Sequence, residues 1–172
     1  IHSDSILNTV SEVAPMAKSP NYWLFKSEPD VYSIQDLAKE SGKTTTWEGV
    51  RNYQVRNMLR DDIKVGDGVL FYHSRVEPMC IAGTARVVKD GYPDHFAFDE
   101  KHRYFDAKSD PENPRWYMVD VKLVQVFDTP VTRDMLRENT TAAAMKVGHS
   151  RTMGEMPMAL AATTSLEPDI RP

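Results

Sequence analysis

The sequence predicts an α+β domain, built as a small, curved, mixed β-barrel with short helices packed on its outside. Three observations lead to this prediction. Segments rich in β-branched and aromatic residues are short and numerous, and two or three helical patterns lie between them. The strand segments are also too short and too often interrupted for a doubly wound parallel sheet.

Five segments carry strand signals. The first is aromatic and apolar and stops at Glu28-Pro29, and the last shows the clearest alternation of apolar and polar residues. Gly83 interrupts the fourth, which indicates a bulge or a close approach of backbone. Asp90-Gly91 is a turn signal, and a long loop rich in charges and aromatic residues is expected over 91–115. The expected strands cover residues 22–26, 44–47, 69–73, 80–89 and 116–127.

Three helices are predicted from capping residues followed by apolar positions at helical spacing. Ser33, with Asp36 three residues later, is typical of a helix N-terminus, and this helix is expected to stop near Gly42. Asn52 is the expected cap of a second helix that ends near residue 62. Thr132 is the expected cap of the third.

The length of 172 residues suits one domain with tails. We expect a flexible N-terminal arm over residues 1–20, a single domain over 21–160 and a C-terminal tail over 161–172. A net charge of −4 argues against a protein that coats nucleic acid by bulk charge, although it allows a local basic patch.

Cellular location is predicted from three features of the sequence. No apolar run approaches the length of a membrane span, so no membrane association is expected. The first twenty residues lack the pattern of a signal peptide. Cys80 is the single cysteine, so an intrachain disulfide is impossible, which fits a reducing compartment. We therefore expect an intracellular protein of the nucleus or cytoplasm, not a secreted one.

The segment from Trp47 to Tyr53 carries the strongest chemical signal. It places a tryptophan, a glycine, an arginine and an asparagine within six residues. An aromatic face together with amide and cationic groups is what a pocket for one planar, polar ring requires, because the face stacks and the edge is read by hydrogen bonds.

Four blocks of the sequence stand out, in this order: Tyr22-Trp23-Leu24-Phe25-Lys26-Ser27-Glu28-Pro29, Trp47-Glu48-Gly49-Val50-Arg51-Asn52-Tyr53-Gln54, Phe71-Tyr72-His73-Ser74 and Asp110-Pro111-Glu112-Asn113-Pro114-Arg115-Trp116. Over about residues 21–138 they resemble the signatures of the EVE domain, in the same order along the chain. This family implies a PUA-like β-barrel related to the YTH domains, which hold a methylated adenine in an aromatic cage. Its members are thought to read modified bases, particularly modified cytosines. Residues 150–152 and 156–157 match the family's C-terminal pattern only weakly.

The resemblance and the residue chemistry together give a set of candidate base-binding residues. Trp47 matches the cage tryptophan of related readers and is the expected stacking wall, with an ordinary core tryptophan as the alternative. Trp116 or a loop aromatic (Tyr104 or Phe105) is a candidate second wall, although core packing is the favoured role of Trp116. The full set is Lys26, Ser27, Trp47, Val50, Arg51, Asn52, Tyr72, His73, Ser74, Trp116 and Arg151.

Roles within this set follow from side-chain chemistry. Lys26, Ser27 and Asn52 are expected to read the base edge, while Asn52 has the competing role of helix cap. Arg51 is expected to hold phosphate. Strand alternation puts Phe71 and His73 on one face, and Tyr72 and Ser74 on the other, so only one of these pairs faces a ligand. We expect Trp47→Ala to abolish binding without unfolding the domain.

The function predicted from the sequence is a non-enzymatic reader of a modified nucleobase in DNA or RNA, preferably single-stranded or flipped. A protein-interaction module is the alternative, and an enzyme acting on a nucleotide is less favoured, because no nucleophile motif or phosphate-binding glycine loop occurs. Asp94, His95, Asp99 and His102 have no recognised metal-ligand spacing. We therefore predict no catalytic residue, metal or cofactor, and protein partners remain unknown.

Overall fold

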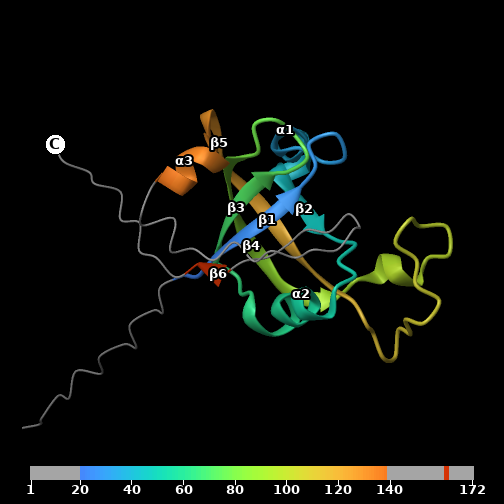
Figure 1. The fold of residues 1–172 in the computed structure, drawn as a ribbon. Helices are drawn as coiled ribbons and strands as arrows, with labels where there is room; N and C mark the ends of the chain where they lie inside the picture. The colour runs from blue at the N-terminus through green and yellow to red at the C-terminus, as the bar shows by residue number, and fades with distance from the viewer. Residues whose placement is uncertain (1–19, 139–160, 163–172) are drawn as a thin grey trace, which may run out of the picture.

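The computed structural model describes residues 20–138 and 161–162 of the chain, which fold as one mixed sheet with short helices around it (Figure 1). The predicted α+β class is confirmed. The helical elements are α1 (Ile34–Lys39), η1 (Ser41–Lys43), α2 (Tyr53–Asn57), η2 (Met58–Asp62), η3 (His95–Phe98) and α3 (Arg133–Glu138). The strands are β1 (Tyr22–Ser27), β2 (Thr44–Trp47), β3 (Gly68–His73), β4 (Cys80–Pro93), β5 (Tyr117–Thr132) and β6 (Ala161–Ala162).

The six strands lie in the order β2-β5-β4-β3-β1-β6. Strands β1 and β3 pair in parallel, and the other neighbours pair antiparallel. Within the described part of the chain the end strands β2 and β6 do not pair with each other, so the predicted barrel is an open sheet here. Ala161 and Ala162, which the sequence analysis assigned to the tail, pair with β1.

The helix caps form as their sequences predict. The Ser33 side chain accepts from the Asp36 amide while the Asp36 carboxylate accepts from the Ser33 amide, which makes a complete capping box at the start of α1. The Asn52 side chain accepts from the amides of Gln54 and Val55 at the start of α2. These bonds satisfy amides that have no partner within the helix, so each helix begins where the sequence indicates.

The two longest strands run past their predicted ends, and β5 ends at Thr132 instead of residue 127. Strand β4 continues through Asp90-Gly91 to Pro93, so the expected turn at that dipeptide is wrong: antiparallel pairing with β5 carries the strand past it. The interpretation of Gly83 is confirmed. The pairing register shifts beside it, and a Cβ there would lie 2.2 Å from the Gln125 carbonyl oxygen.

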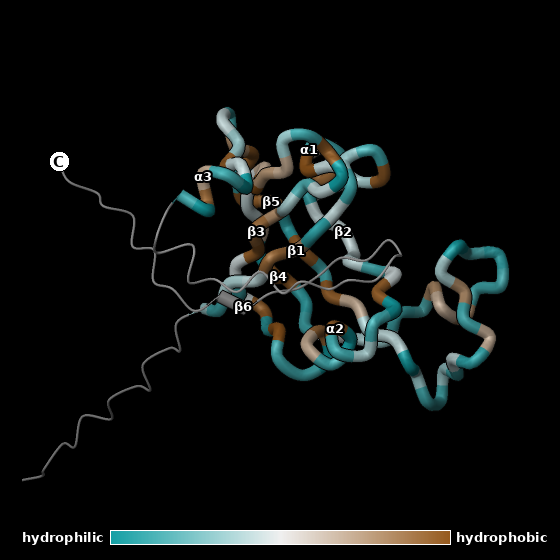
Figure 2. The backbone as a smooth tube through the Cα atoms, in the orientation of Figure 1, coloured by the Kyte–Doolittle hydropathy of each residue, from teal (hydrophilic) through white to brown (hydrophobic). Residues whose placement is uncertain are grey.

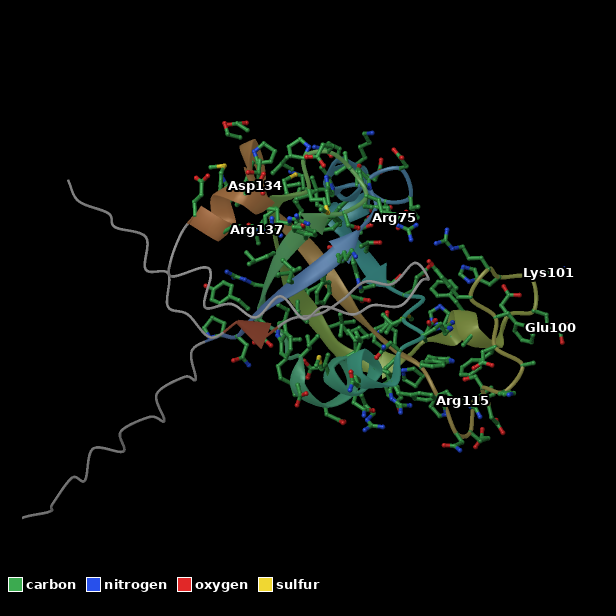
Figure 3. The ribbon with its side chains drawn as sticks, viewed as in Figure 1. Arg75, Glu100, Lys101, Arg115, Asp134 and Arg137 are labelled. Atoms are coloured by element: carbon green, nitrogen blue, oxygen red, sulfur yellow. The ribbon has the colours of Figure 1, made fainter. Side chains whose placement is uncertain are left out.

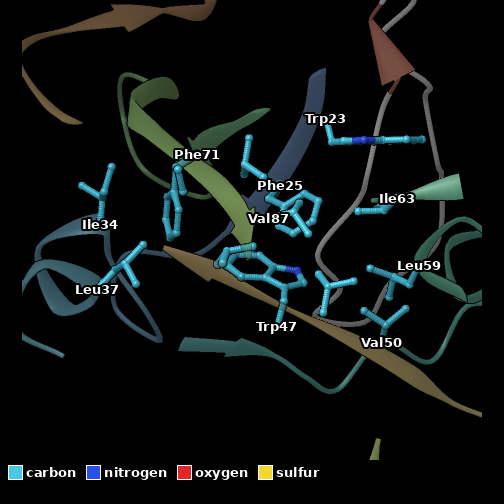
Figure 4. Packing of buried hydrophobic residues seen from close by; sticks show 14 of the residues in the cluster. Trp23, Phe25, Ile34, Leu37, Trp47, Val50, Leu59, Ile63, Phe71 and Val87 are labelled. Carbon is cyan, nitrogen blue, oxygen red and sulfur yellow. The ribbon is translucent and has the colours of Figure 1, made fainter. Parts of the chain in front are cut away.

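The hydrophobic core lies between the sheet and the helices at its ends (Figure 4). Figure 2 shows the apolar residues concentrated on the strands and the polar residues on the loop that leads through η3 from β4 to β5. In Figure 1 this loop stands out from the sheet, while α1 and α2 lie at opposite ends of it. Among the residues that the structure describes, no helix has both the length and the apolar character that a membrane span needs.

A buried histidine joins β3 to α1. His73 is buried, and its Nε2 accepts a hydrogen bond from the Ile34 amide at 3.1 Å. Burial lowers the pKa of His73 below its ordinary value, because the apolar surroundings disfavour the charged imidazolium. A protonated Nε2 could not accept the Ile34 amide, so the neutral imidazole is part of the folded structure.

We predict that the domain loses stability on mild acidification, through His73. The folded-state pKa lies below the unfolded value of about 6.5, so the unfolded chain binds the proton more readily. The contribution of His73 is therefore complete above that pH and falls as the pH drops below it, until the folded-state pKa is reached. Urea unfolding at pH 7.5 and 5.5 measures the loss.

His73→Gln keeps a hydrogen-bond acceptor but does not titrate, so the loss of stability between these pH values should be smaller in this variant. His95→Gln is the matched control, because His95 is exposed. Equal acid sensitivity in the wild type and His73→Gln would contradict the assignment.

Candidate functional site

A cavity of about 330 Å³ opens at the end of β1, between the turn that leads to α1, strand β2 and the loop after η3. Aromatic, hydroxyl and charged side chains all reach it. The cavity lies near the lower end of the range of about 300–1,000 Å³ that is usual for small-ligand sites. Its lining residues are Lys26, Ser27, Val31, Tyr32, Glu40, Thr45, Thr46, Trp47, Glu48, Arg103 and Tyr104.

The charges of this cavity are balanced. Lys26 and Arg103 are cationic, whereas Glu40 and Glu48 are anionic. At the rim, Glu48 accepts a hydrogen bond from Thr46 at 3.2 Å and lies 3.8 Å from the His102 imidazole. A balanced lining favours a neutral, polar ligand over a phosphate or another multiply charged anion.

Trp47 combines the two roles that the sequence left open. The residue is only 6% exposed, and its side chain packs among core residues, with ring centroids 4.9 Å from Phe25 and 5.5 Å from Phe71 (Figure 4). The same residue lines the cavity. The core therefore fixes the position of the indole at the cavity wall.

This burial corrects the expectation for Trp47→Ala. Removing a large buried side chain typically lowers the free energy of unfolding by about 3–5 kcal/mol. We therefore predict that Trp47→Ala destabilises the domain strongly in urea unfolding. A variant with the stability of the wild type would contradict the core role of Trp47.

Lys26 and Ser27 line the cavity, because they end β1 where the strand meets the turn. The Ser27 hydroxyl donates to the Tyr32 carbonyl oxygen at 2.7 Å. The carbonyl oxygen of Ser27 accepts hydrogen bonds from both the amide and the hydroxyl of Ser74. The geometry gives Ser27 a role in holding the turn, while Lys26 is the cation at this end of the cavity.

Arg51 organises the loop that carries Tyr104. Its guanidinium donates to Asp94 at 2.8 Å and to the Tyr104 carbonyl oxygen, and Asp94 is fully buried. The guanidinium carbon lies 5.6 Å from the Tyr104 ring centroid and 5.3 Å from that of Trp116. The predicted phosphate contact of Arg51 therefore competes with this positioning role.

Trp116 packs beside the same Arg51 guanidinium as Tyr104 but does not line the cavity. Its ring stacks on Tyr53 at 5.0 Å, and its indole N–H donates to Asp106 at 2.7 Å. That hydrogen bond is the main reason why the pKa of Asp106 is held below its ordinary value. Of the loop aromatics considered from the sequence as a second wall, Tyr104 lines the cavity.

The other candidate residues are engaged elsewhere in the fold. Asn52 is occupied as the cap of α2, and Val50 is fully buried in the core. His73 faces the core beside Phe71, with ring centroids 5.7 Å apart, and is bonded to the first turn of α1. Tyr72 is half-buried, and Ser74 is fixed on Ser27. None of these five lines the cavity, and Arg151 lies outside the described residues.

Several lining residues were not selected from the sequence, because their signals were local and weak. Thr45 lies two residues before Trp47 on β2, so strand alternation puts both on one face. Tyr32 lies three residues after Pro29 of the Glu28-Pro29 turn signal. The remaining residues of this kind are Val31, Glu40, Thr46, Glu48 and Arg103.

The loop that carries Tyr104 has many charged side chains of both signs. Glu100 and Lys101 lie at its outer end, away from the sheet, and Arg115 lies where the loop returns toward β5 (Figure 3). Glu100 and Lys101 are exposed, and Arg115 is half-buried. Because opposite charges alternate here, the described loop is not a single-sign surface for a polyanion.

The fold and the sequence now define the class of protein. A match to the EVE domain covers residues 21–162, which is most of the chain. The chain therefore belongs to the EVE domain family, and the family predicted from the sequence is confirmed.

Individual relatives extend this finding. Thymocyte nuclear protein 1 of Gallus gallus is 46% identical over 114 residues, which are 61% of this chain and 47% of that protein. The human protein of the same name is 43% identical over 116 residues, or 62% of this chain and 51% of that protein. The chain spans about half the length of these curated relatives.

Two solved structures show the same fold. A hypothetical protein from Leishmania major has a TM-score of 0.71 and 44% identity, covering 81% of this chain and 87% of that chain. The human THYN1 protein, solved in complex with DNA containing 5-methylcytosine, has a TM-score of 0.66 and 39% identity, covering 72% of this chain and 77% of that chain.

The position of Tyr104 depends on a glycine, which gives a testable prediction. Gly49 has a φ of 76°, and a Cβ there would lie 2.4 Å from the Tyr104 ring. Gly49→Ala should therefore strain the backbone and also displace Tyr104 from the cavity. We expect it to lower stability and to expose backbone amides of residues 99–105 to faster hydrogen exchange.

Gly66→Ala is the matched control. Gly66 also has a positive φ, of 97°, but nothing lies within 4 Å of a Cβ there. We expect it to lose about 1–2 kcal/mol of stability from backbone strain without change in hydrogen exchange of the loop. If both variants affect the loop equally, steric contact with Tyr104 is not what Gly49 provides.

Proposed function

We propose that this domain binds one modified cytosine base of DNA in the cavity at the end of β1, without catalysing a reaction. The observation that carries the proposal is the cavity itself. Its volume of about 330 Å³ suits a single small ring system, and Trp47, Tyr104 and Tyr32 supply aromatic surface around it. Aromatic surface of this kind stacks on the faces of a base.

The polar lining supports a cytosine rather than a generic apolar ligand. Cytosine offers an exocyclic amino group as a donor, and a carboxylate is a preferred acceptor for that group. Glu48 and Glu40 provide carboxylates in the cavity, and Lys26 provides a donor for the acceptor atoms of the same base. The balanced charge of the lining fits a neutral base whose phosphates stay outside.

The comparison with the human relative supports the choice of ligand. That protein has been solved with DNA containing 5-methylcytosine, and it shares the fold and 39% of aligned residues with this chain. The nuclear proteins among the relatives also support an intracellular location, in the nucleus. Because the chain covers about half of these proteins, their further activities and partners are not carried over.

The free energies of methyl burial and of base flipping limit which ligand the cavity can select. Burying one methyl group contributes about 0.8 kcal/mol, or roughly a fourfold preference, whereas flipping a paired base opposes binding by a few kcal/mol. Selectivity therefore needs more than the methyl group, for example a polar group that the wrong base leaves unpaired. We expect tighter binding to a single strand or a mismatched site than to an intact duplex.

The proposal is tested by titrating the full chain with short strands, using calorimetry with tryptophan fluorescence in parallel. The strands are single-stranded DNA with one 5-methylcytosine, the same strand unmodified, and an RNA strand with the same modification. Saturable binding that favours the modified DNA strand is expected. No binding to any strand would remove the proposed function and favour a protein-interaction module.

Lys26→Met tests whether the cavity is the binding site. It keeps most of the side-chain length but removes the ammonium group, so we expect at least about a tenfold weaker Kd for the modified strand, as for loss of a charged hydrogen bond. Urea unfolding should be nearly unchanged.

Lys64→Met is the matched control, because it removes the same charge from an exposed position before the start of β3, outside the cavity. Equal weakening by both substitutions would mean that overall charge, and not the cavity, governs binding.

A further inference from the structure

Tyr32 is held rigidly at the cavity by the turn between β1 and α1. Its amide donates to the Glu28 carbonyl oxygen at 2.8 Å, and its own carbonyl oxygen accepts from the Ser27 hydroxyl at 2.7 Å. The ring packs against the core, with its centroid 6.5 Å from that of Phe71. The backbone is therefore anchored on both sides, and the ring has a fixed position against the cavity.

The hydroxyl of Tyr32 has no partner within the protein. Over residues 20–138, its Oη is the one buried side-chain nitrogen or oxygen that makes no hydrogen bond. Thr45 and Glu40 are its polar neighbours and also line the cavity, but neither forms a hydrogen bond of normal geometry with it. Burial is the main cause that raises the pKa of Tyr32, so the group is a neutral hydroxyl that can both donate and accept.

An unpaired buried hydroxyl is unfavourable for folding. Leaving such a group unsatisfied costs about 1–3 kcal/mol, and native structures leave few polar groups in this state. A phenylalanine would fill the same space without that penalty. Tyr32 and its neighbour Glu40 both line the cavity, and Glu40 is exposed, so a ligand that displaces the Glu40 side chain reaches the hydroxyl.

We propose that the Tyr32 hydroxyl is a specificity-determining contact that hydrogen-bonds a polar edge atom of the bound base. The proposal rests on the proposed function and adds a base-contacting residue that the sequence did not indicate. The base edge supplies the partner that the free protein lacks, so binding removes an existing penalty. Trp47 and Tyr104 contribute aromatic surface in this arrangement, and Tyr32 contributes a directed hydrogen bond.

The reason why a hydroxyl suits this position is geometric. Lys26 and Glu48 are long, flexible side chains that adapt to many ligands. The Tyr32 ring is fixed by core packing and by the turn that holds its backbone. Its hydroxyl can therefore bond only to an atom at one position. A ligand that brings no polar atom there leaves the hydroxyl buried and unpaired, which selects against it.

The test compares Tyr32→Phe with the wild-type full chain in two measurements. The first is the Kd for single-stranded DNA with one 5-methylcytosine and for the same strand with an abasic site at that position. The second is urea unfolding without DNA. Tyr22→Phe is the matched control, because Tyr22 lies at the opposite end of β1, beside Gly68, and does not line the cavity.

We expect Tyr32→Phe to bind the modified strand about three- to tenfold more weakly, as for one lost neutral hydrogen bond, and to bind the abasic strand as the wild type does. Its urea midpoint should equal or exceed that of the wild type. Tyr22→Phe should match the wild-type affinity for both strands.

Three other outcomes would overturn the proposal, and they can be told apart. Unchanged affinity of Tyr32→Phe for the modified strand means that the hydroxyl does not contact the base. A loss of both stability and affinity means that the hydroxyl has a structural role. If the wild type itself binds neither strand, the proposed function fails, and this inference fails with it.

Discussion

The ion pair between Arg51 and Asp94 is the interaction on which the candidate site depends. Asp94 is fully buried and accepts from the Arg51 guanidinium, from the Gly49 amide and from the Phe96 amide. A buried carboxylate is tolerated only when it is paired and hydrogen-bonded in this way. Because the partners come from the segment after β2 and from η3, the pair joins two distant segments of the chain.

The consequence of this pair is the position of Tyr104. Arg51 also bonds to the Tyr104 carbonyl oxygen and lies near both the Tyr104 and Trp116 rings. The close approach of the ring to Gly49 then sets the distance between the loop and the end of β2. A loop that would otherwise stand free of the sheet thereby supplies one wall of the cavity.

The core and the cavity share side chains, which ties the stability of the domain to the proposed recognition. Trp47 packs on Phe25 and Phe71 and also reaches the cavity. Tyr32 also packs near Phe71, with ring centroids 6.5 Å apart. Shared packing gives a preorganised site, in which little side-chain entropy remains to be lost on binding. It also means that large truncations at these positions change the fold, whereas removal of a single polar atom does not.

The sequence by itself determined the family, the α+β class, the helix caps and most strand centres, because these depend on local patterns. The capping box at Ser33 and the cap at Asn52 are bonds between neighbouring residues, so spacing alone predicts them. Only the tertiary structure decided which side chains meet at the cavity. Lys26, Tyr32, Trp47 and Tyr104 come together through the parallel pairing of β1 with β3, the packing of α1 and the Arg51–Asp94 pair. These are contacts between segments far apart in the chain, and no local pattern encodes their geometry.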